Sequence, residues 1–356
     1  MSIRHRQIAN HGRFVRPADT SPRPTALMAA SWIAGIASLT AVFYFVLRFN
    51  DLQLFVTLLQ RANVSWLLLA LLCQGMTYVF ASLVWNIALA RSEPKLPFAS
   101  LMKIGFLQIF ANQMLPTSGL TGTLIVIRAL KARGVKTACA LSGVLIDTFT
   151  YYAVYLILAL GSFTLIWRRR SGDLDWLPVL VAFVLLAGAI LLCLAIIGRK
   201  RQRIIPPFFL RWRPFAYLAV GLSEMDVTIL RDVRINLFAA VCQFAVFLLD
   251  AATLWCVTRS IGLGVDLLAS LTSFLVASVV ATIAPLPMGL GSFEGASTMT
   301  LYAFGAGPEA ALAATLIFRG LTLWLPMIPG FLFFRSELTR IRARSDLPAQ
   351  GAKNDV

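Results

Sequence analysis

APLPMGLGSFEGA, residues 284–296, sets two prolines, three glycines and one carboxylate between two apolar runs. Proline and glycine interrupt helical hydrogen bonding, and the hydrocarbon of a membrane offers no water to satisfy the backbone groups that are freed. Irregular chain at membrane depth therefore persists only where protein buries it or where it lines a wet cavity. The stretch predicts a cavity inside a bundle of membrane helices.

The composition of the whole chain is that of an integral membrane protein. Of its 356 residues, 58% are hydrophobic and 13% charged, and the mean hydropathy is +0.78; soluble domains carry roughly 25% charged residues. The formal net charge of +16 comes from Lys and Arg in the short connections, as the positive-inside rule expects. Membrane topology thus explains the charge without a nucleic-acid partner, and the basic tail does not look like a cleaved signal peptide.

Apolar segments close to the roughly 20 residues that cross a bilayer recur along the chain and predict an all-α, polytopic bundle. Two further apolar regions, 97–130 and 267–304, are each broken by a Pro/Gly turn, and the arm 292–304 is too short to cross as a helix. We interpret both as re-entrant helical hairpins, with Pro-kinked spans joined by tight turns as the alternative. Six full crossings are predicted, at 26–47, 64–90, 138–167, 177–198, 235–258 and 308–334.

The distribution of Lys and Arg predicts the orientation of the membrane domain, residues 26–335. With the N-terminus inside, 21 Lys and Arg fall in inside segments and six in outside ones. The tails 1–25 and 336–356 are then both cytoplasmic, at the inner membrane of the cell. The two hairpins enter from opposite faces, as in inverted repeats whose substrate site lies near the midplane. The basic, amphipathic segment 199–235 is expected in the interface, as a topology anchor or a lipid-headgroup site.

Charged side chains inside the apolar segments are the first candidates for function, because a charge at the bilayer centre costs roughly 2.5 to 3.5 kcal/mol. Glu294 is the strongest candidate, since it follows the turn of the second hairpin and is expected to face the cavity. Its expected ion-pair partner is Arg319 or Arg128. Asp147 and Asp250 are the other intramembrane acids, and Asp250 has the alternative role of locking helices together.

The turns of the hairpins offer a second kind of site. The amides that follow Gly119 and Gly122, and those of Gly291 to Phe293, are expected at helix N-termini, where free N–H groups and positive dipole ends suit a phosphate headgroup. Asn112 and Gln113 supply neutral donors or simply cap the broken helix. The predicted turn residues are Pro116, Gly119, Gly122, Pro285, Pro287, Gly289 and Gly291, and the predicted substrate contacts are Glu294, Arg319, Arg128, Asn112, Gln113 and Ser292.

The sequence contains no recognisable enzymatic pattern. Both histidines, His5 and His11, lie in the N-terminal tail, so neither a Ser/His triad nor a histidine metal site is expected in the membrane. The five cysteines lie in apolar segments without CxxC spacing, which favours structural burial. We predict no enzyme activity, no cofactor and no metal. The expected partners are membrane lipids, with a separate lipid-synthesising enzyme and a second copy of the chain as further candidates.

Three motifs resemble one known family. PMGLGSFE at 287–294, FRGLTLWLP at 318–326 followed by Gly330, and NQMLP at 112–116 resemble the flippase-like transmembrane domain of lysylphosphatidylglycerol synthases. The resemblance covers roughly residues 26–335 and implies a flippase-type fold with two re-entrant hairpins and a phospholipid or isoprenoid-linked substrate. The chain has Thr-Gly-Thr at 121–123 where many relatives carry an acid, and the aminoacyl-transferring domain of the bifunctional synthases is not expected in it.

These features together predict a lipid translocator. The opposed hairpins form a polar cavity for a phosphate-bearing headgroup, while the acyl or isoprenoid tails stay in the bilayer. The alternative is a non-transporting membrane partner that recruits or stabilises a separate lipid-modifying enzyme.

Overall fold

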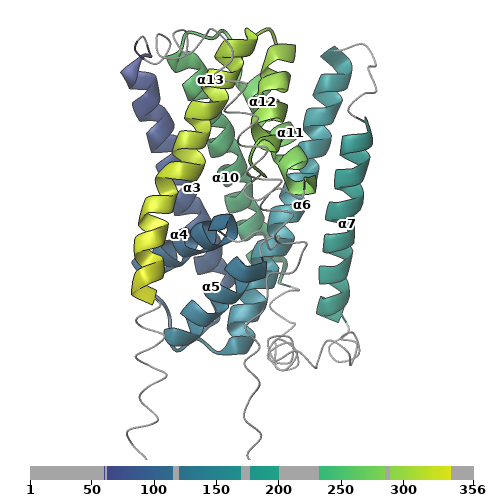
Figure 1. The fold of residues 1–356 in the computed structure, drawn as a ribbon. Helices are drawn as coiled ribbons and strands as arrows, with labels where there is room; N and C mark the ends of the chain where they lie inside the picture. Colours follow the sequence, from purple (N-terminus) through teal and green to yellow (C-terminus); the bar gives the residue numbers. More distant parts are fainter. Residues whose placement is uncertain are drawn as a thin grey trace, which may run out of the picture.

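A computed structural model of the chain describes residues 60, 62–114, 120–169, 177–199, 232–284 and 289–337, and every regular element in these ranges is helical (Figure 1). The all-α prediction is therefore confirmed for this part of the chain. In chain order the elements are α3 (Val64–Ala88), α4 (Phe98–Met114), α5 (Leu120–Ala132), α6 (Thr137–Arg169), α7 (Leu177–Arg199), α10 (Val233–Ser260), α11 (Leu267–Ile283), α12 (Ser292–Ala303), α13 (Pro308–Arg319) and the π-helix η3 (Gly320–Trp324), beyond which the chain stays helical to residue 337.

Four helices are long and apolar enough to cross a membrane: Val64–Ala88, Thr137–Thr164, Val233–Ser260 and Pro308–Glu337. They match four of the six predicted crossings. The 23-residue helix α7 spans the predicted crossing at 177–198. The predicted crossing at 26–47 and nearly all of the interfacial segment 199–235 lie outside the described residues. The prediction of a helical membrane protein is confirmed.

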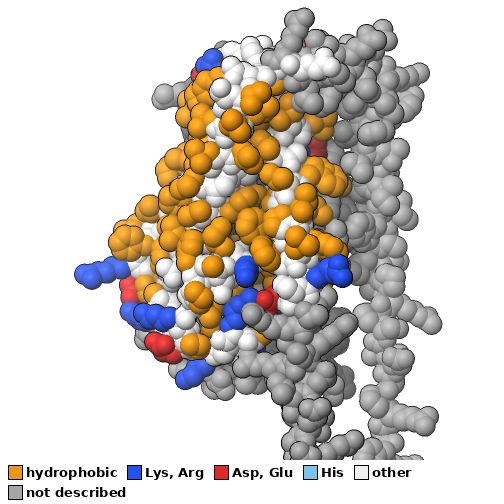
Figure 2. Space-filling view, turned by 90° about the vertical axis from the view of Figure 1, so that its left-hand side faces the viewer, with side chains coloured by type: hydrophobic (Ala, Val, Ile, Leu, Met, Phe, Trp, Pro, Cys, Tyr) orange, Lys and Arg blue, Asp and Glu red, His pale blue; other side chains and the backbone are white. Residues whose placement is uncertain are grey.

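The surface of the bundle suits a hydrocarbon environment. Large apolar side chains stand exposed along several helices, among them Leu68 on α3, Leu185 on α7 and Phe238 on α10. Figure 2 shows hydrophobic side chains over most of the height of one face, with charged side chains gathered toward its lower end. Water would disfavour so much exposed apolar surface, whereas lipid tails accept it.

Helices α3 and α10 lie side by side and antiparallel. At one end the Asn63 N–H donates to the Ser260 carbonyl oxygen at 2.7 Å, and at the other Arg91 pairs with Asp232 at 2.5 Å. The side chains of Asn63 and Asp232 also cap α3 and α10 by accepting backbone N–H bonds, which satisfies donors that a helix start leaves unpaired. The start of each helix therefore lies at the same face as the end of the other, as the predicted topology requires.

Aromatic rings fill the core between α6, α7 and α10. The Tyr155 ring centroid lies 4.6 Å from that of Phe183 and 5.1 Å from that of Phe247, and all three side chains are buried. Helices in a bilayer gain little from transfer out of water, so close packing of this kind has to hold them together.

The two broken regions form two helical hairpins, α4 with α5 and α11 with α12. Figure 1 shows α11 and α12 in the upper part of the bundle and α4 and α5 in the lower part. The turn residues 115–119 and 285–288 lie outside the described residues, and with them the predicted residues Pro116, Gly119, Pro285 and Pro287.

A buried polar seam ties the hairpin of α11 and α12 to α13. Ser273 Oγ donates to the Ser297 carbonyl oxygen at 3.1 Å, and Thr315 Oγ1 donates to Ser297 Oγ at 3.0 Å. All three side chains are fully buried. Small polar residues allow close helix approach and then bond across the interface, so this hairpin and α13 form one packed unit.

The hairpin of α4 and α5 packs against the C-terminal part of the long helix Pro308–Glu337, which begins with α13. Gly330 makes the contact possible, because a Cβ there would lie 2.6 Å from Phe110 Cβ and 3.0 Å from the Phe106 carbonyl oxygen. Arg133, just after α5, donates through Nη1 to Glu337 Oε2 at 2.9 Å, and Nη2 contacts the other carboxylate oxygen. The helix Pro308–Glu337 is thus fastened to both hairpins.

Candidate functional site

The start of α12 is built on two glycines of the interrupted stretch. Gly289 has φ of 61° and Gly291 has φ of 81°, in the left-handed region that favours glycine. A Cβ on Gly289 would also lie 2.8 Å from Ala281 Cβ of α11. Ser292 Oγ donates to the Gly289 carbonyl oxygen at 3.0 Å. The Ser292 hydroxyl therefore stabilises the turn, and its role as a substrate contact stays a prediction.

Glu294 and Arg319 form a buried ion pair between α12 and α13. Glu294 Oε1 accepts from Arg319 Nε at 2.8 Å, and Glu294 Oε2 accepts from the Gly291 backbone N–H at 2.7 Å. Glu294 is 4% exposed and Arg319 8%. One carboxylate thus caps the first turn of α12 and holds the guanidinium of the next helix.

This geometry resolves one prediction and corrects another. Of the two partners expected for Glu294, the structure has Arg319. The expectation that the Gly291 amide is free to bind a ligand is wrong, because the Glu294 carboxylate already occupies it. The reason is local: Glu294 is the third residue of α12, and an acid at that position reaches back to the backbone N–H of the residue that precedes the helix.

Aromatic rings support the guanidinium of Arg319. Arg319 Cζ lies 4.9 Å from the centroid of the Phe293 ring, a distance at which a cation is attracted to a ring face. The Phe293 ring stacks on that of Phe318 with centroids 5.8 Å apart, and Phe274 meets Phe318 edge-on at 5.9 Å. Three helices, α11, α12 and α13, therefore fix the position of this charge.

The helix changes its geometry immediately after Arg319. Gly320–Trp324 form a π-helix inside an otherwise α-helical segment. Such π-bulges are rare and frequently occur at functional sites. Arg319 and Thr322 both line the cavity beside the ion pair, so the irregular turn lies at the cavity wall.

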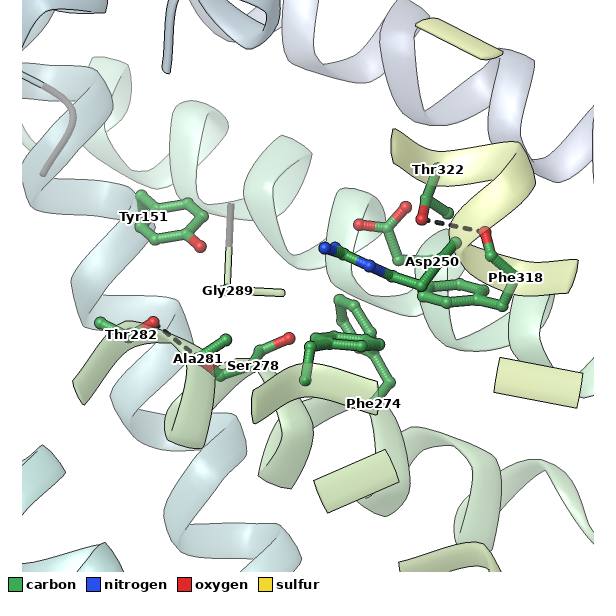
Figure 3. A pocket seen from close by; sticks show the side chains of 11 residues that line it. Tyr151, Asp250, Phe274, Ser278, Ala281, Thr282, Gly289, Phe318 and Thr322 are labelled. Carbon is green, nitrogen blue, oxygen red and sulfur yellow. Dashed lines mark hydrogen bonds between the residues drawn. The ribbon is translucent and has the colours of Figure 1, made fainter. Parts of the chain in front are cut away.

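A cavity of about 310 Å³ lies beside the ion pair (Figure 3), at the lower end of the roughly 300 to 1,000 Å³ typical of ligand pockets. Its wall combines aromatic rings with hydroxyl groups and charged side chains. The lining residues are Tyr151 of α6, Asp250 of α10, Phe274, Ser278, Ala281 and Thr282 of α11, Gly289, Phe293 of α12, Phe318 and Arg319 of α13, and Thr322 of η3.

The two intramembrane aspartates, Asp147 and Asp250, have different surroundings. Gln243 Nε2 of α10 donates to Asp147 Oδ1 at 3.0 Å, and Thr77 Oγ1 of α3 donates to Asp250 Oδ1 at 3.3 Å. Of the two acids, Asp250 lines the cavity, whereas Asp147 joins α6 to α10. The structure thus gives Asp147 a helix-locking contact and puts Asp250 at the candidate site.

The first hairpin contributes no described residue to the cavity wall. Arg128 is exposed on α5 and lies outside the described cavity wall, so its role as a substrate contact stays a prediction. Gly122 is buried in the first turn of α5. Asn112 and Gln113 belong to the last turn of α4, and their side chains lie outside the described part of the structure. In the described residues, the cavity lies between α6, α10, α13 and the second hairpin.

Sequence reasoning missed four polar residues of the wall: Tyr151, Ser278, Thr282 and Thr322. Ser and Thr are common packing residues in membrane helices, so neither stands out alone. Ser278 and Thr282 are four residues apart on α11, and Thr282 Oγ1 donates to the Ser278 carbonyl oxygen at 2.8 Å. Their spacing, which places both on one helix face just before the break at residue 284, was the available signal.

Comparison with known protein families identifies the membrane region of the chain. The family model described as the lysylphosphatidylglycerol synthase TM region matches residues 32–330. The matched range contains the ion pair and all the described residues of the cavity wall. No curated protein matches the chain.

Proposed function

This chain belongs to the lysylphosphatidylglycerol synthase TM-region family, and we propose that it moves a phospholipid or isoprenoid-linked lipid between the leaflets of the membrane. The observation that carries the proposal is the buried pair of Glu294 and Arg319 beside a polar cavity. Charges inside a membrane protein are costly unless paired or wet, and they commonly mark a substrate pathway.

The lengths of the hairpin helices support a re-entrant arrangement. α11 has 17 residues and α12 has 12, while α4 has 17 and α5 has 13. At 1.5 Å per residue, α12 extends about 18 Å, little more than half the hydrocarbon core. In our proposal the two hairpins enter from opposite faces among six full crossings, both termini are cytoplasmic, and the membrane is the inner one.

The chemistry of the cavity suits the phosphate of a lipid headgroup. A phosphate binds a guanidinium through charge-assisted hydrogen bonds, so it can compete with Glu294 for Arg319. Hydroxyl groups of Ser278, Thr282 and Thr322 line the same space and can donate to the remaining phosphate oxygens. The lipid tails stay outside, against the exposed apolar side chains of the bundle.

The same wall argues for transport in place of catalysis. Its described residues include no histidine and no cysteine, and the Thr282 and Thr322 hydroxyls donate to backbone carbonyl oxygens and not to the Asp250 carboxylate, so neither is activated as a nucleophile. We propose that the chain binds and moves its lipid without altering it.

Reconstitution tests the proposal directly. The full chain is inserted into liposomes that contain fluorescent phosphatidylglycerol or a fluorescent isoprenoid phosphate, and the label in the outer leaflet is destroyed with a membrane-impermeant reductant. The wild type should expose inner-leaflet label to the reductant, and Glu294→Gln should slow this exposure. Glu309→Gln is the matched control, because Glu309 lies in the first turn of α13 and outside the described cavity wall.

Two outcomes would contradict the proposal. One is that the wild type moves neither probe, and the other is that Glu294→Gln moves lipid as fast as the wild type. Copurification of a stoichiometric lipid-modifying enzyme, together with absence of lipid movement, would favour the non-transporting partner instead.

A further inference from the structure

Asp250 is a carboxylate within a membrane-spanning helix that makes no ion pair with any described residue. It lies in α10, which runs from Val233 to Ser260, well away from either end. A bare carboxylate at this depth is unfavourable, and Glu294 solves the same problem by pairing with Arg319. Asp250 faces the cavity without such a partner.

The hydrogen bond between Asp250 and Thr77 fits both protonation states of Asp250. Thr77 Oγ1 lies 3.3 Å from Asp250 Oδ1 and 3.2 Å from the Cys73 carbonyl oxygen. A hydroxyl has one proton to donate and lone pairs to accept another. When Asp250 is ionised, Thr77 can donate to it. When Asp250 is protonated, Thr77 can donate to Cys73 and accept the proton of the acid.

Titratable and charged groups approach Asp250 from three of the helices packed on α10, namely α3, α6 and α13. α3 brings Tyr78 and α6 brings Tyr151, both close enough to interact electrostatically with Asp250. From α13, Arg319 lines the same cavity with its Nε bonded to Glu294 of α12. The described residues that α11 adds to the cavity wall are uncharged. Figure 3 shows Asp250 with Tyr151 and Ser278 around the cavity.

Protonation of Asp250 therefore sets the charge of the cavity. With Asp250 ionised, the described charged groups at the cavity are two carboxylates, those of Asp250 and Glu294, and one guanidinium, that of Arg319. With Asp250 protonated, the charges balance. An anionic headgroup is repelled by the first state and accepted by the second, so a proton and a phosphate should each favour binding of the other by reciprocal linkage.

We propose that Asp250 is a proton-binding site of the cavity and that it couples lipid movement to proton movement in the same direction. This inference rests on the proposed lipid movement. Hydronium from one aqueous face gives one proton to the Asp250 carboxylate, forming an O–H bond and leaving water. The neutral site takes the phosphate headgroup, and at the other face water accepts the proton as the headgroup leaves.

A pH gradient across liposomes tests the coupling. The full chain is reconstituted with fluorescent phosphatidylglycerol, and an acid-inside or acid-outside gradient is imposed. In the wild type the label should accumulate in the leaflet on the alkaline side, by about tenfold for a gradient of about one pH unit if one proton moves with each lipid. Asp250→Asn should abolish this bias. Asp147→Asn is the matched control and should retain it, because Asp147 lies outside the described cavity wall.

A second measurement detects the proton without any lipid movement. Infrared difference spectra of the full chain at two pH values should contain a carboxylic-acid C=O band that is lost in Asp250→Asn and kept in Asp147→Asn. An unchanged spectrum in Asp250→Asn would overturn the proposal that Asp250 is the proton-binding site. Label that distributes equally with and without a gradient would overturn the coupling and leave the proposed function standing. If the wild type moves no label at all, the proposed function and the coupling both fail, and the infrared band alone decides whether Asp250 binds a proton.

Discussion

The pair of Glu294 and Arg319 should be worth several kcal/mol to the folded protein, and a double-mutant cycle measures how much. The side chains are 6% and 10% exposed. Two unit charges about 4 Å apart attract by about 4 kcal/mol at an effective dielectric constant of 20. Removing one member leaves the other buried and uncompensated, which costs about 3 to 5 kcal/mol.

The structure also predicts what each single change does. Glu294 uses both oxygens, one for Arg319 and one for the Gly291 amide. Glutamine has one oxygen, so Glu294→Gln can satisfy only one of the two donors. Arg319→Met keeps the bulk of the side chain but leaves the carboxylate without its cation. The double variant removes both charges, and we expect it to cost about as much as either single change.

The assay is reversible unfolding of the full chain in mixed micelles, with the free energy of unfolding measured for the wild type, both single variants and the double variant. We expect a coupling energy of about 3 kcal/mol, at the upper end of values for contacting residues. Glu309→Gln in an Arg319→Met background is the control cycle and should be additive. Additivity of the Glu294 and Arg319 changes to within about 0.5 kcal/mol would refute the ion pair.

Three further predictions use the same unfolding assay. Gly289→Ala should lower the free energy of unfolding by about 2 kcal/mol, because Gly289 has a positive φ and lies close to Ala281 Cβ. Gly295→Ala is the control, since Gly295 lies in α12 with open space around it, and this change should raise the free energy of unfolding by up to about 1 kcal/mol. Equal effects of the two changes would contradict the turn geometry. Gly330→Ala should cost about 1 to 3 kcal/mol through overlap with α4, and a harmless substitution would place that helix pair further apart. Thr315→Val should cost about 0.6 to 1.7 kcal/mol by removing the bond to Ser297, so an unchanged stability would show that the polar seam contributes nothing.

The sequence predicted the helical architecture well because hydrocarbon imposes simple limits. Long runs of apolar residues that must cross a bilayer are helices. The breaks predicted at 116–122 and 284–296 lie close to the observed helix ends, since α4 ends at Met114, α5 begins at Leu120, α11 ends at Ile283 and α12 begins at Ser292. The family resemblance, drawn from three motifs, is confirmed by the match over residues 32–330.

The cavity wall was harder to predict because helix rotation leaves little trace in these segments. A helix with one face on lipid and the other on protein is apolar all round, so no stripe of hydrophobic residues shows which side faces inward. Arg319 and Arg128 looked equivalent for this reason, although one is buried against Glu294 and the other is exposed. Tyr151 gave no signal either, because tyrosine is ordinary in a membrane helix.

Photochemical labelling tests the central claim, that a lipid headgroup occupies the cavity beside Glu294 and Arg319. The full chain is reconstituted with phosphatidylglycerol that carries a diazirine on its headgroup, irradiated, digested and mapped by mass spectrometry. We predict adducts on the cavity segments 278–282 and 318–322, reduced in Glu294→Gln and competed away by unlabelled lipid. Adducts confined to exposed apolar positions such as Leu237 and Val241 of α10, unaffected by Glu294→Gln, would contradict the claim.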